Sequence, residues 1–223
     1  HMNTRLIRTH PLFQGLGDAQ FTQALSYLDA SEKGYPKGAF LNRISMPLTR
    51  FGLVLSGVVM VAMNDLNGNQ MIMASVKGGD TFGESLCYLG VEASVLICAA
   101  TDVSVLWLST EKLKMHSGQS PLGCELCNRF TAMLANRTLS MNERIQILSK
   151  KSIRDKLLTF FSQYASKDGG AFTIPFERSS MAAFLGCDRS ALSRELSNMQ
   201  AEGILQFQKN EFQILNAHHE TND

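Results

Sequence analysis

One stretch near the C-terminus decides the fold: Leu185–Leu205, which reads LGCDRSALSRELSNMQAEGIL. Its apolar side chains recur three or four positions apart, which is the period of a helix with one buried face. These inner residues are Ala191, Leu192, Leu196 and Met199. The stretch therefore predicts an amphipathic helix whose other face is left for solvent or for a partner.

The residues around this helix predict where it begins and what precedes it. Asp188 is a favoured N-cap residue, and Gly203 is typical of the position just past a helix end. Ahead of them, Ser179 is expected to cap a short helix over residues 180–184, and Gly186 lies in the turn that follows. Two helices joined by a short turn that contains glycine form a helix-turn-helix.

The outer face of the second helix is small, polar and cationic. Ser190, Ser193, Arg194 and Ser197 recur at helical spacing, with Arg189 beside them in the first turn. Small side chains let a helix approach the DNA major groove closely, while arginine reaches guanine O6 and N7. The alternative is the solvated face of an ordinary helix.

The residues that follow favour the DNA-reading interpretation. Residues 204–208 and 211–215 are expected to form a two-stranded ribbon around a turn at Lys209-Asn210. A ribbon directly after a helix-turn-helix is the wing of a winged helix.

The middle of the chain has a different period. From Leu41 to about Leu108 it consists of short β-type segments separated by turn signals, of which Asn67-Gly68 is the strongest hairpin signal. Many short strands at this spacing predict a small antiparallel barrel or jelly roll.

Between these two regions the period is again helical, from about Pro121 to Lys150. A helix of roughly 30 residues is about 45 Å long, too long to be covered by one small barrel. We expect its apolar stripe to pack on a second copy of the chain; an internal core helix is the alternative. The stripe consists of Leu126, Phe130, Met133, Met141, Ile145 and Leu148.

Composition limits the function classes. The net charge of +1 is no general sign of nucleic-acid binding, so such a function depends on local arrangement. The five cysteines are scattered, which favours reduced thiols in the cytoplasm over a disulfide framework. No apolar run approaches the length that spans a bilayer, so no membrane association is expected.

The whole chain resembles the cyclic-AMP receptor protein/fumarate-nitrate regulator (Crp/Fnr) family of transcription factors, most clearly in two segments. The more specific is FLGCDRSALSRELSNMQAEGIL, and the other is GGDTFGES, Gly78–Ser85. The resemblance implies an α+β fold of three parts. These are an N-terminal antiparallel β-roll of the jelly-roll, cyclic-nucleotide-binding type (3–118), a dimerisation helix and hinge (119–150), and a C-terminal winged helix-turn-helix (151–223).

The resemblance also implies partners and residue roles. A homodimer would bind a near-palindromic site in double-stranded DNA, with RNA polymerase as a further partner and an unidentified effector in the β-roll. By position, Arg189, Ser190, Ser193 and Arg194 would read the bases.

The expected effector site departs from the family's pattern. Gly83, Glu84 and Ser85 match the turn that binds the phosphate of a cyclic nucleotide. The arginine that would clamp this phosphate is replaced by Ala93, before Ser94 and after Glu92. Losing one partner of such a charge pair costs about 2–5 kcal/mol, so we expect no useful binding of cyclic AMP.

Other effectors stay open at this point. Met71 and Met73, with Met60 and Met63, could line a pocket for an apolar ligand or simply fill the core. Cys124 and Cys127 form a CxxC pair on one helix face, which fits a redox sensor, a zinc half-site or two structural thiols. Haem ligation by His116 and a regulator without any ligand are further alternatives, and no metal site is predicted.

An enzyme is not expected. The sequence assembles no Ser–His–Asp set, no paired carboxylates in a glycine-rich turn and no Walker loop. A thiol oxidoreductase that uses Cys124 and Cys127 is the least implausible enzyme.

Overall fold

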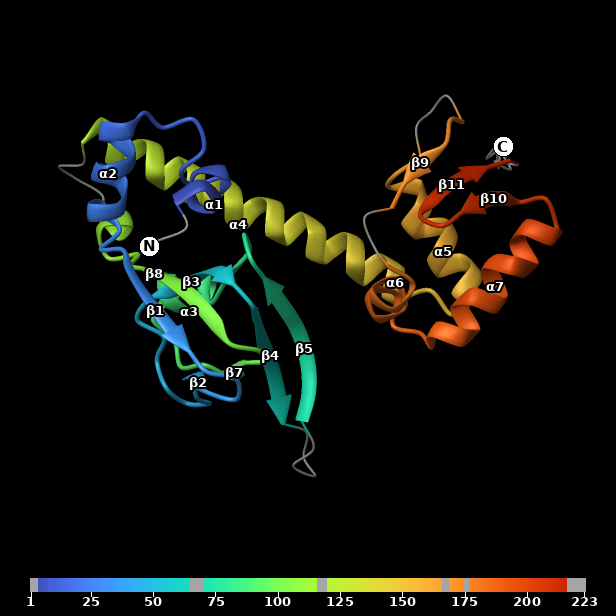
Figure 1. The fold of residues 1–223 in the computed structure, drawn as a ribbon, viewed down its shortest axis with the longest axis horizontal. Helices are drawn as coiled ribbons and strands as arrows, with labels where there is room; N and C mark the ends of the chain where they lie inside the picture. The colour runs from blue at the N-terminus through green and yellow to red at the C-terminus, as the bar shows by residue number, and fades with distance from the viewer. Residues whose placement is uncertain (1–3, 65–69, 116–119, 166–168, 175–176, 216–223) are drawn as a thin grey trace. The chain divides into compact units, whose positions relative to one another are not determined.

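The computed structural model describes residues 4–64, 70–115, 120–165, 169–174 and 177–215. Contacts divide the chain into two units, residues 1–136 and 137–223, and each unit is described by itself. Helix α4 (Pro121–Leu148) is continuous across the division, so its first half belongs to one unit and its second half to the other (Figure 1).

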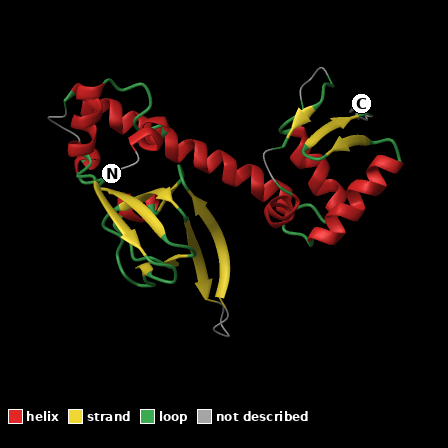
Figure 2. Cartoon of the chain, viewed as in Figure 1, coloured by secondary structure: helices red, strands yellow, loops and turns green. Residues whose placement is uncertain are grey.

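The first unit contains the predicted antiparallel β-roll, which confirms the fold class (Figures 1 and 2). One sheet has the order β1-β8-β3-β6 and the other the order β2-β7-β4-β5. The strands are β1 (Ser31–Tyr35), β2 (Phe40–Asn42), β3 (Phe51–Ser56), β4 (Val58–Asn64), β5 (Gln70–Lys77), β6 (Thr81–Phe82), β7 (Leu96–Ala99) and β8 (Val103–Leu108).

The roll begins earlier than the sequence predicts. Strand β1 precedes Leu41 and pairs with β8, from Ser31 opposite Trp107 to Tyr35 opposite Val103. Strands β4 and β5 form the expected central hairpin, but its Asn67-Gly68 turn lies outside the described residues.

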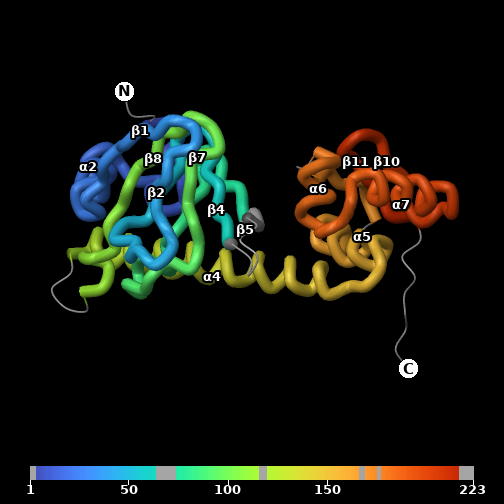
Figure 3. The backbone as a smooth tube through the Cα atoms, turned by 90° about the horizontal axis from the view of Figure 1, so that it is seen from below, coloured from blue at the N-terminus to red at the C-terminus, as the bar shows by residue number. Residues whose placement is uncertain are grey.

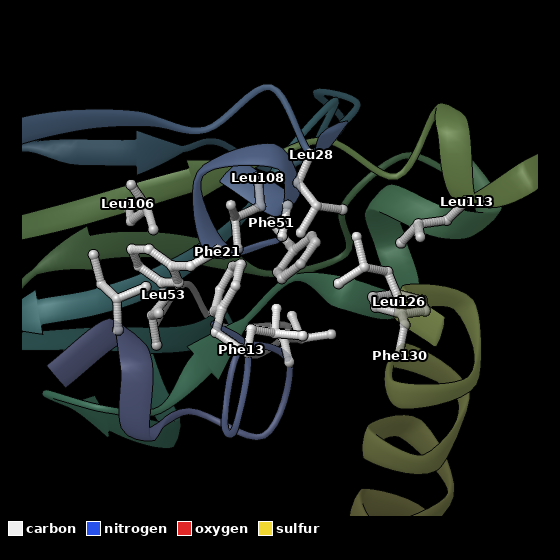
Figure 4. Packing of buried hydrophobic residues seen from close by; sticks show 14 of the residues in the cluster. Phe13, Phe21, Leu28, Phe51, Leu53, Leu106, Leu108, Leu113, Leu126 and Phe130 are labelled. Carbon is white, nitrogen blue, oxygen red and sulfur yellow. The ribbon is translucent and has the colours of Figure 1, made fainter. Parts of the chain in front are cut away.

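Short helices close one end of the roll and enclose its main core. They are α1 (Thr4–Thr9), α2 (Asp18–Tyr27), α3 (Glu84–Leu89) and the 3₁₀-helix η1 (Lys112–Lys114). Figure 4 shows Phe13 and Phe21 from the N-terminal segment meeting Phe51 of β3 and Phe130 of α4. The Phe51 and Phe130 ring centroids are 5.6 Å apart.

The prediction that the whole apolar stripe of α4 packs on a second copy is wrong for its first half. Leu126 and Phe130 are buried in the core of the β-roll, and Met133 packs against that core. The roll itself covers this part of the stripe. By contrast, Met141 and Ile145 in the second half are 59% and 60% exposed.

The second unit contains the expected winged helix-turn-helix. Figures 1 and 3 show α7 on the outside of this unit. Its elements are α5 (Ile153–Ser162), β9 (Phe172–Thr173), α6 (Arg178–Leu185), α7 (Arg189–Ala201), β10 (Leu205–Gln208) and β11 (Glu211–Ile214). Strand β9 adds a third strand, which the sequence did not predict, to the β10–β11 ribbon.

The first helix of the motif starts earlier than expected. Helix α6 begins at Arg178 with Glu177 as N-cap, and Glu177 makes no side-chain capping bond. Ser179 is therefore inside the helix and is not its cap, so the prediction was wrong by two residues at this end.

Candidate nucleic-acid interface and effector turn

Helix α7 begins at a strong cap. The Asp188 carboxylate accepts hydrogen bonds from the backbone N–H groups of Ser190 at 2.9 Å and Ala191 at 3.1 Å, and from the Ser190 hydroxyl. The bonds from Ser190 and Ala191 lower the pKa of Asp188 below its ordinary value. The carboxylate therefore stays ionised and fixes the first turn, as the sequence predicted.

The two faces of α7 differ as its sequence indicates. Leu192, Leu196 and Met199 are fully buried and hold the helix to its domain. The four predicted base readers are all exposed and lie on the first two turns of the helix. They are Arg189, Ser190, Ser193 and Arg194.

The turn before α7 is held from α5. Gly186 has a φ of 62°, and a Cβ at this position would lie 2.9 Å from Leu148 Cδ2. Only glycine therefore fits here without a shift. Lys156 Nζ donates a hydrogen bond to the Leu185 carbonyl at 3.1 Å, which satisfies one of the free carbonyls at the end of α6.

The far end of α7 is held by Arg154, a contact that sequence reasoning missed. Its guanidinium donates two hydrogen bonds to the Glu202 carboxylate, at 2.7 Å each, and one to Glu195 at 2.6 Å. These bonds, those to Glu202 first, raise the pKa of Arg154 still further above its ordinary value. Arg154 and Lys156 are thus both engaged inside the domain.

The wing is braced by Arg178, which sequence reasoning also missed. Its guanidinium carbon lies 5.1 Å from the Phe207 ring centroid and 5.0 Å from that of Phe212. Nη2 donates to the Lys209 carbonyl at 3.0 Å, at the wing tip, where Lys209 has a φ of 54°. Partial burial lowers the pKa of Arg178. The tip is therefore held in a fixed conformation by the first residue of α6.

In the first unit, the expected phosphate turn is closely packed at Gly83. Gly83 has a φ of 79°, and a Cβ there would collide with Leu48 Cδ2. The Glu84 side chain is buried and accepts a hydrogen bond from the Thr81 hydroxyl, while Ser85 is exposed.

The position of the missing clamp, Ala93, is buried and held by backbone hydrogen bonds. Ala93 is 2% exposed, its N–H donates to the Met46 carbonyl at 3.2 Å, and its own carbonyl accepts from the Ser45 N–H at 2.8 Å. Ser94 is exposed, and the side chains of Met71 and Met73 on β5 lie outside the described part of the structure.

Comparison with known proteins identifies both units. Residues 32–115 match the family model of the cyclic nucleotide-binding domain, and residues 155–219 match that of the Crp-like helix-turn-helix domain. The chain belongs to the Crp/Fnr family. It is therefore a Crp/Fnr-type transcriptional regulator with a DNA-binding helix-turn-helix.

Individual Crp/Fnr relatives extend over most of the chain. A cyclic AMP receptor protein of Thermus thermophilus is 26% identical and aligns over 87% of this chain and 88% of its own length. Electron transport regulator A of Shewanella oneidensis is 24% identical, over 86% and 77% respectively. The crystal structure of the Thermus thermophilus catabolite activator protein covers 92% of this chain and 93% of that one, with a TM-score of 0.50 and 26% identity.

The remaining predicted sites stay predictions. Cys124 is exposed and Cys127 half-buried, and neither is in a disulfide. His116 is outside the described residues. Within the described ranges, no three His, Cys, Asp or Glu side chains come together as metal ligands, and no helix could span a membrane.

Proposed function

We propose that this protein is a homodimeric regulator that reads a near-palindromic DNA site through Arg189, Ser190, Ser193 and Arg194. The observation that carries the proposal is the exposure of these four side chains on a helix whose opposite face is fully buried. Arginine gives directional bonds to guanine, and the serines permit close approach to the groove. A helix fixed at both ends presents this set in one orientation.

The dimer is supported by the second half of α4. Met141 and Ile145 are exposed at 59% and 60%, and Leu148 at 41%, and their spacing of four and three residues places all three on one face of the helix. An exposed apolar row on one helix indicates a protein partner. Because a two-fold axis brings identical surfaces together, a second α4 is a natural partner for this row. Two copies would present two α7 helices to successive major grooves, about 34 Å apart.

Regulation by an effector in the β-roll is part of the proposal, and we do not expect this effector to be cyclic AMP. The clamp position is the buried Ala93, which offers no cation to a phosphate. We infer that residues 3–118 sense the effector, 119–150 form the dimer and hinge, and 151–223 bind DNA in the cytoplasm. RNA polymerase is a further proposed partner.

A coupling route from α4 to the reading helix is supported by contacts in the second unit. The Arg144 guanidinium lies 5.3 Å from the Phe184 ring centroid of α6, and Leu148 touches the Gly186 turn. A displacement at the end of α4 would therefore also move α6 and the turn before α7. An effector can act on this equilibrium only through different affinities for the two states.

The proposal is tested by selecting bound duplexes from a random DNA pool with the full-length protein. We expect an enriched near-palindrome whose half-sites are about one helical turn apart, protected symmetrically in a footprint. Enrichment of a single asymmetric half-site would contradict the dimer, and no enrichment over input would contradict DNA reading. Because the random pool contains every half-site sequence, the selection identifies the operator directly.

A further inference from the structure

The first turns of α4 carry two thiols that the proposed function does not use. Cys124 and Cys127 are three residues apart within one continuous helix, so their side chains are neighbours on its surface. Cys124 is exposed and Cys127 is half-buried, and both are thiols outside any disulfide. A reagent in solution therefore has access to an adjacent pair of sulfur nucleophiles.

This pair of thiols lies beside helix η1 and helix α2. Cys127 Sγ is 3.4 Å from the Leu113 carbonyl of η1. Tyr27 of α2 donates its hydroxyl proton to the Lys112 carbonyl at 3.0 Å. Burial raises the pKa of Tyr27, and the sulfurs of Cys127 and Cys124 raise it further.

Gly123 explains how the tyrosine approaches so closely. A Cβ at this position would lie 2.9 Å from Tyr27 Oη and 3.1 Å from its Cζ. Glycine inside a helix costs about 1 kcal/mol relative to alanine, so its presence here reflects this contact. The helix turn that bears the two thiols is thereby fixed between α2 and η1.

The distance between the two side chains favours a bridging atom over a disulfide. A disulfide needs Cβ atoms about 3.5–4.5 Å apart, whereas residues three apart on a helix have Cβ atoms about 5–6 Å apart. A disulfide would therefore distort the turn. One bridging atom with sulfur bonds of about 2.3 Å holds two sulfurs about 3.7 Å apart, which the helix tolerates without unwinding.

We propose that Cys124 and Cys127 form a two-thiolate site for thiophilic metal or metalloid ions, which soft sulfur ligands prefer. Trivalent arsenic carrying one organic group matches the site, because two thiols complete its coordination. With an arsine oxide, two As–S bonds form, the As–O bond breaks, and the two thiol protons leave with the oxygen as one water molecule. Nothing is oxidised or reduced.

The test uses reduced full-length protein and phenylarsine oxide, with native mass spectrometry and titration calorimetry. We expect one tightly held phenylarsenic group per chain, which a small dithiol removes and excess monothiol does not. Cys124→Ser should weaken binding at least about 100-fold, because the second, intramolecular bond is lost. Since Cys124 is exposed, this variant should melt at the wild-type temperature.

Matched controls are Cys98→Ser and Cys187→Ser, which should bind as the wild type does. Cys127→Ser should lose affinity as Cys124→Ser does. Equal affinity in the wild type and Cys124→Ser, or loss of the adduct to excess monothiol, would overturn the two-thiolate site. The readout involves no DNA, so failure here is separate from failure of the DNA-binding proposal.

Discussion

The Arg154 guanidinium on α5 donates two parallel hydrogen bonds of 2.7 Å to the Glu202 carboxylate at the end of α7. A planar fork that meets a carboxylate in this way fixes direction as well as distance. A third hydrogen bond joins the same guanidinium to Glu195, which lies about two turns before Glu202 in α7. Arg154 therefore determines the tilt of α7 within its domain.

Replacing Arg154 by methionine should lower the melting temperature and weaken operator binding, by less than the loss of Arg194. Since Arg154 contacts no phosphate in this account, the dependence of log affinity on log salt concentration should keep its slope. A lost phosphate contact would instead reduce that slope by about 1. Fluorescence anisotropy at several salt concentrations separates the two.

The matched control for Arg154→Met is Glu202→Gln. It removes the paired bonds to a carboxylate but leaves Glu195 in place, so its effect on both melting and binding should be smaller. A reduced salt slope in Arg154→Met with unchanged melting would contradict a positioning role.

Stability at acid pH should depend on Asp188. Its pKa in the folded protein lies below the ordinary value of 3.8, because Ser190 and Ala191 donate to the ionised carboxylate. The stabilisation is thus fully present above that value and is lost as the pH falls through the lowered folded pKa. In Asp188→Asn, which keeps an acceptor without the charge, the melting temperature should change less with pH below about 4. An identical pH profile in both proteins would rule out this cap as a source of acid sensitivity.

Cyclic AMP should not bind in the micromolar range. Without a clamping cation, about 2–5 kcal/mol of binding free energy is lost, which is about 30- to 4000-fold in affinity. Titration calorimetry with the full-length protein measures this directly, and a micromolar dissociation constant would refute the account of the effector turn.

The dimer should depend on the exposed row of α4. The double variant Met141→Glu, Ile145→Glu places charges on that row and should sediment as a monomer at micromolar concentration. Ser140→Glu, which adds a charge at another exposed position of the same helix, is the control and should stay dimeric. If the double variant sediments with the mass of the wild type, the dimer surface lies elsewhere.

Local signals made the reading helix predictable. The Asp188 cap, the apolar period through Leu192 and Leu196, and Gly203 all lie within or beside the helix that they define. By contrast, the bonds of Arg154 join residues 41 and 48 positions apart, and no local pattern marks such pairs. The positions of the reading residues were thus predicted, but their supports were not.

The β-roll illustrates the same limit. Strand β1 carries mostly exposed side chains, so it lacks the apolar alternation that predicts a strand. It forms because β8 offers it a partner about 70 positions away in the chain, as in the Ser104–Glu32 hydrogen bond with a separation of 72. In α4 the period predicted the helix, but it could not say which half of the stripe the roll covers.

The measurement that tests the central claim most directly is the affinity of Arg194→Ala for the selected operator and for random DNA of equal length. Losing one arginine–guanine contact should weaken operator binding about 5- to 150-fold per half-site, leaving little preference over random DNA. Arg5→Ala, which removes the same charge in the first unit, should bind as the wild type does. Wild-type operator affinity in a folded, dimeric Arg194→Ala would contradict the assignment of α7 as the reading helix.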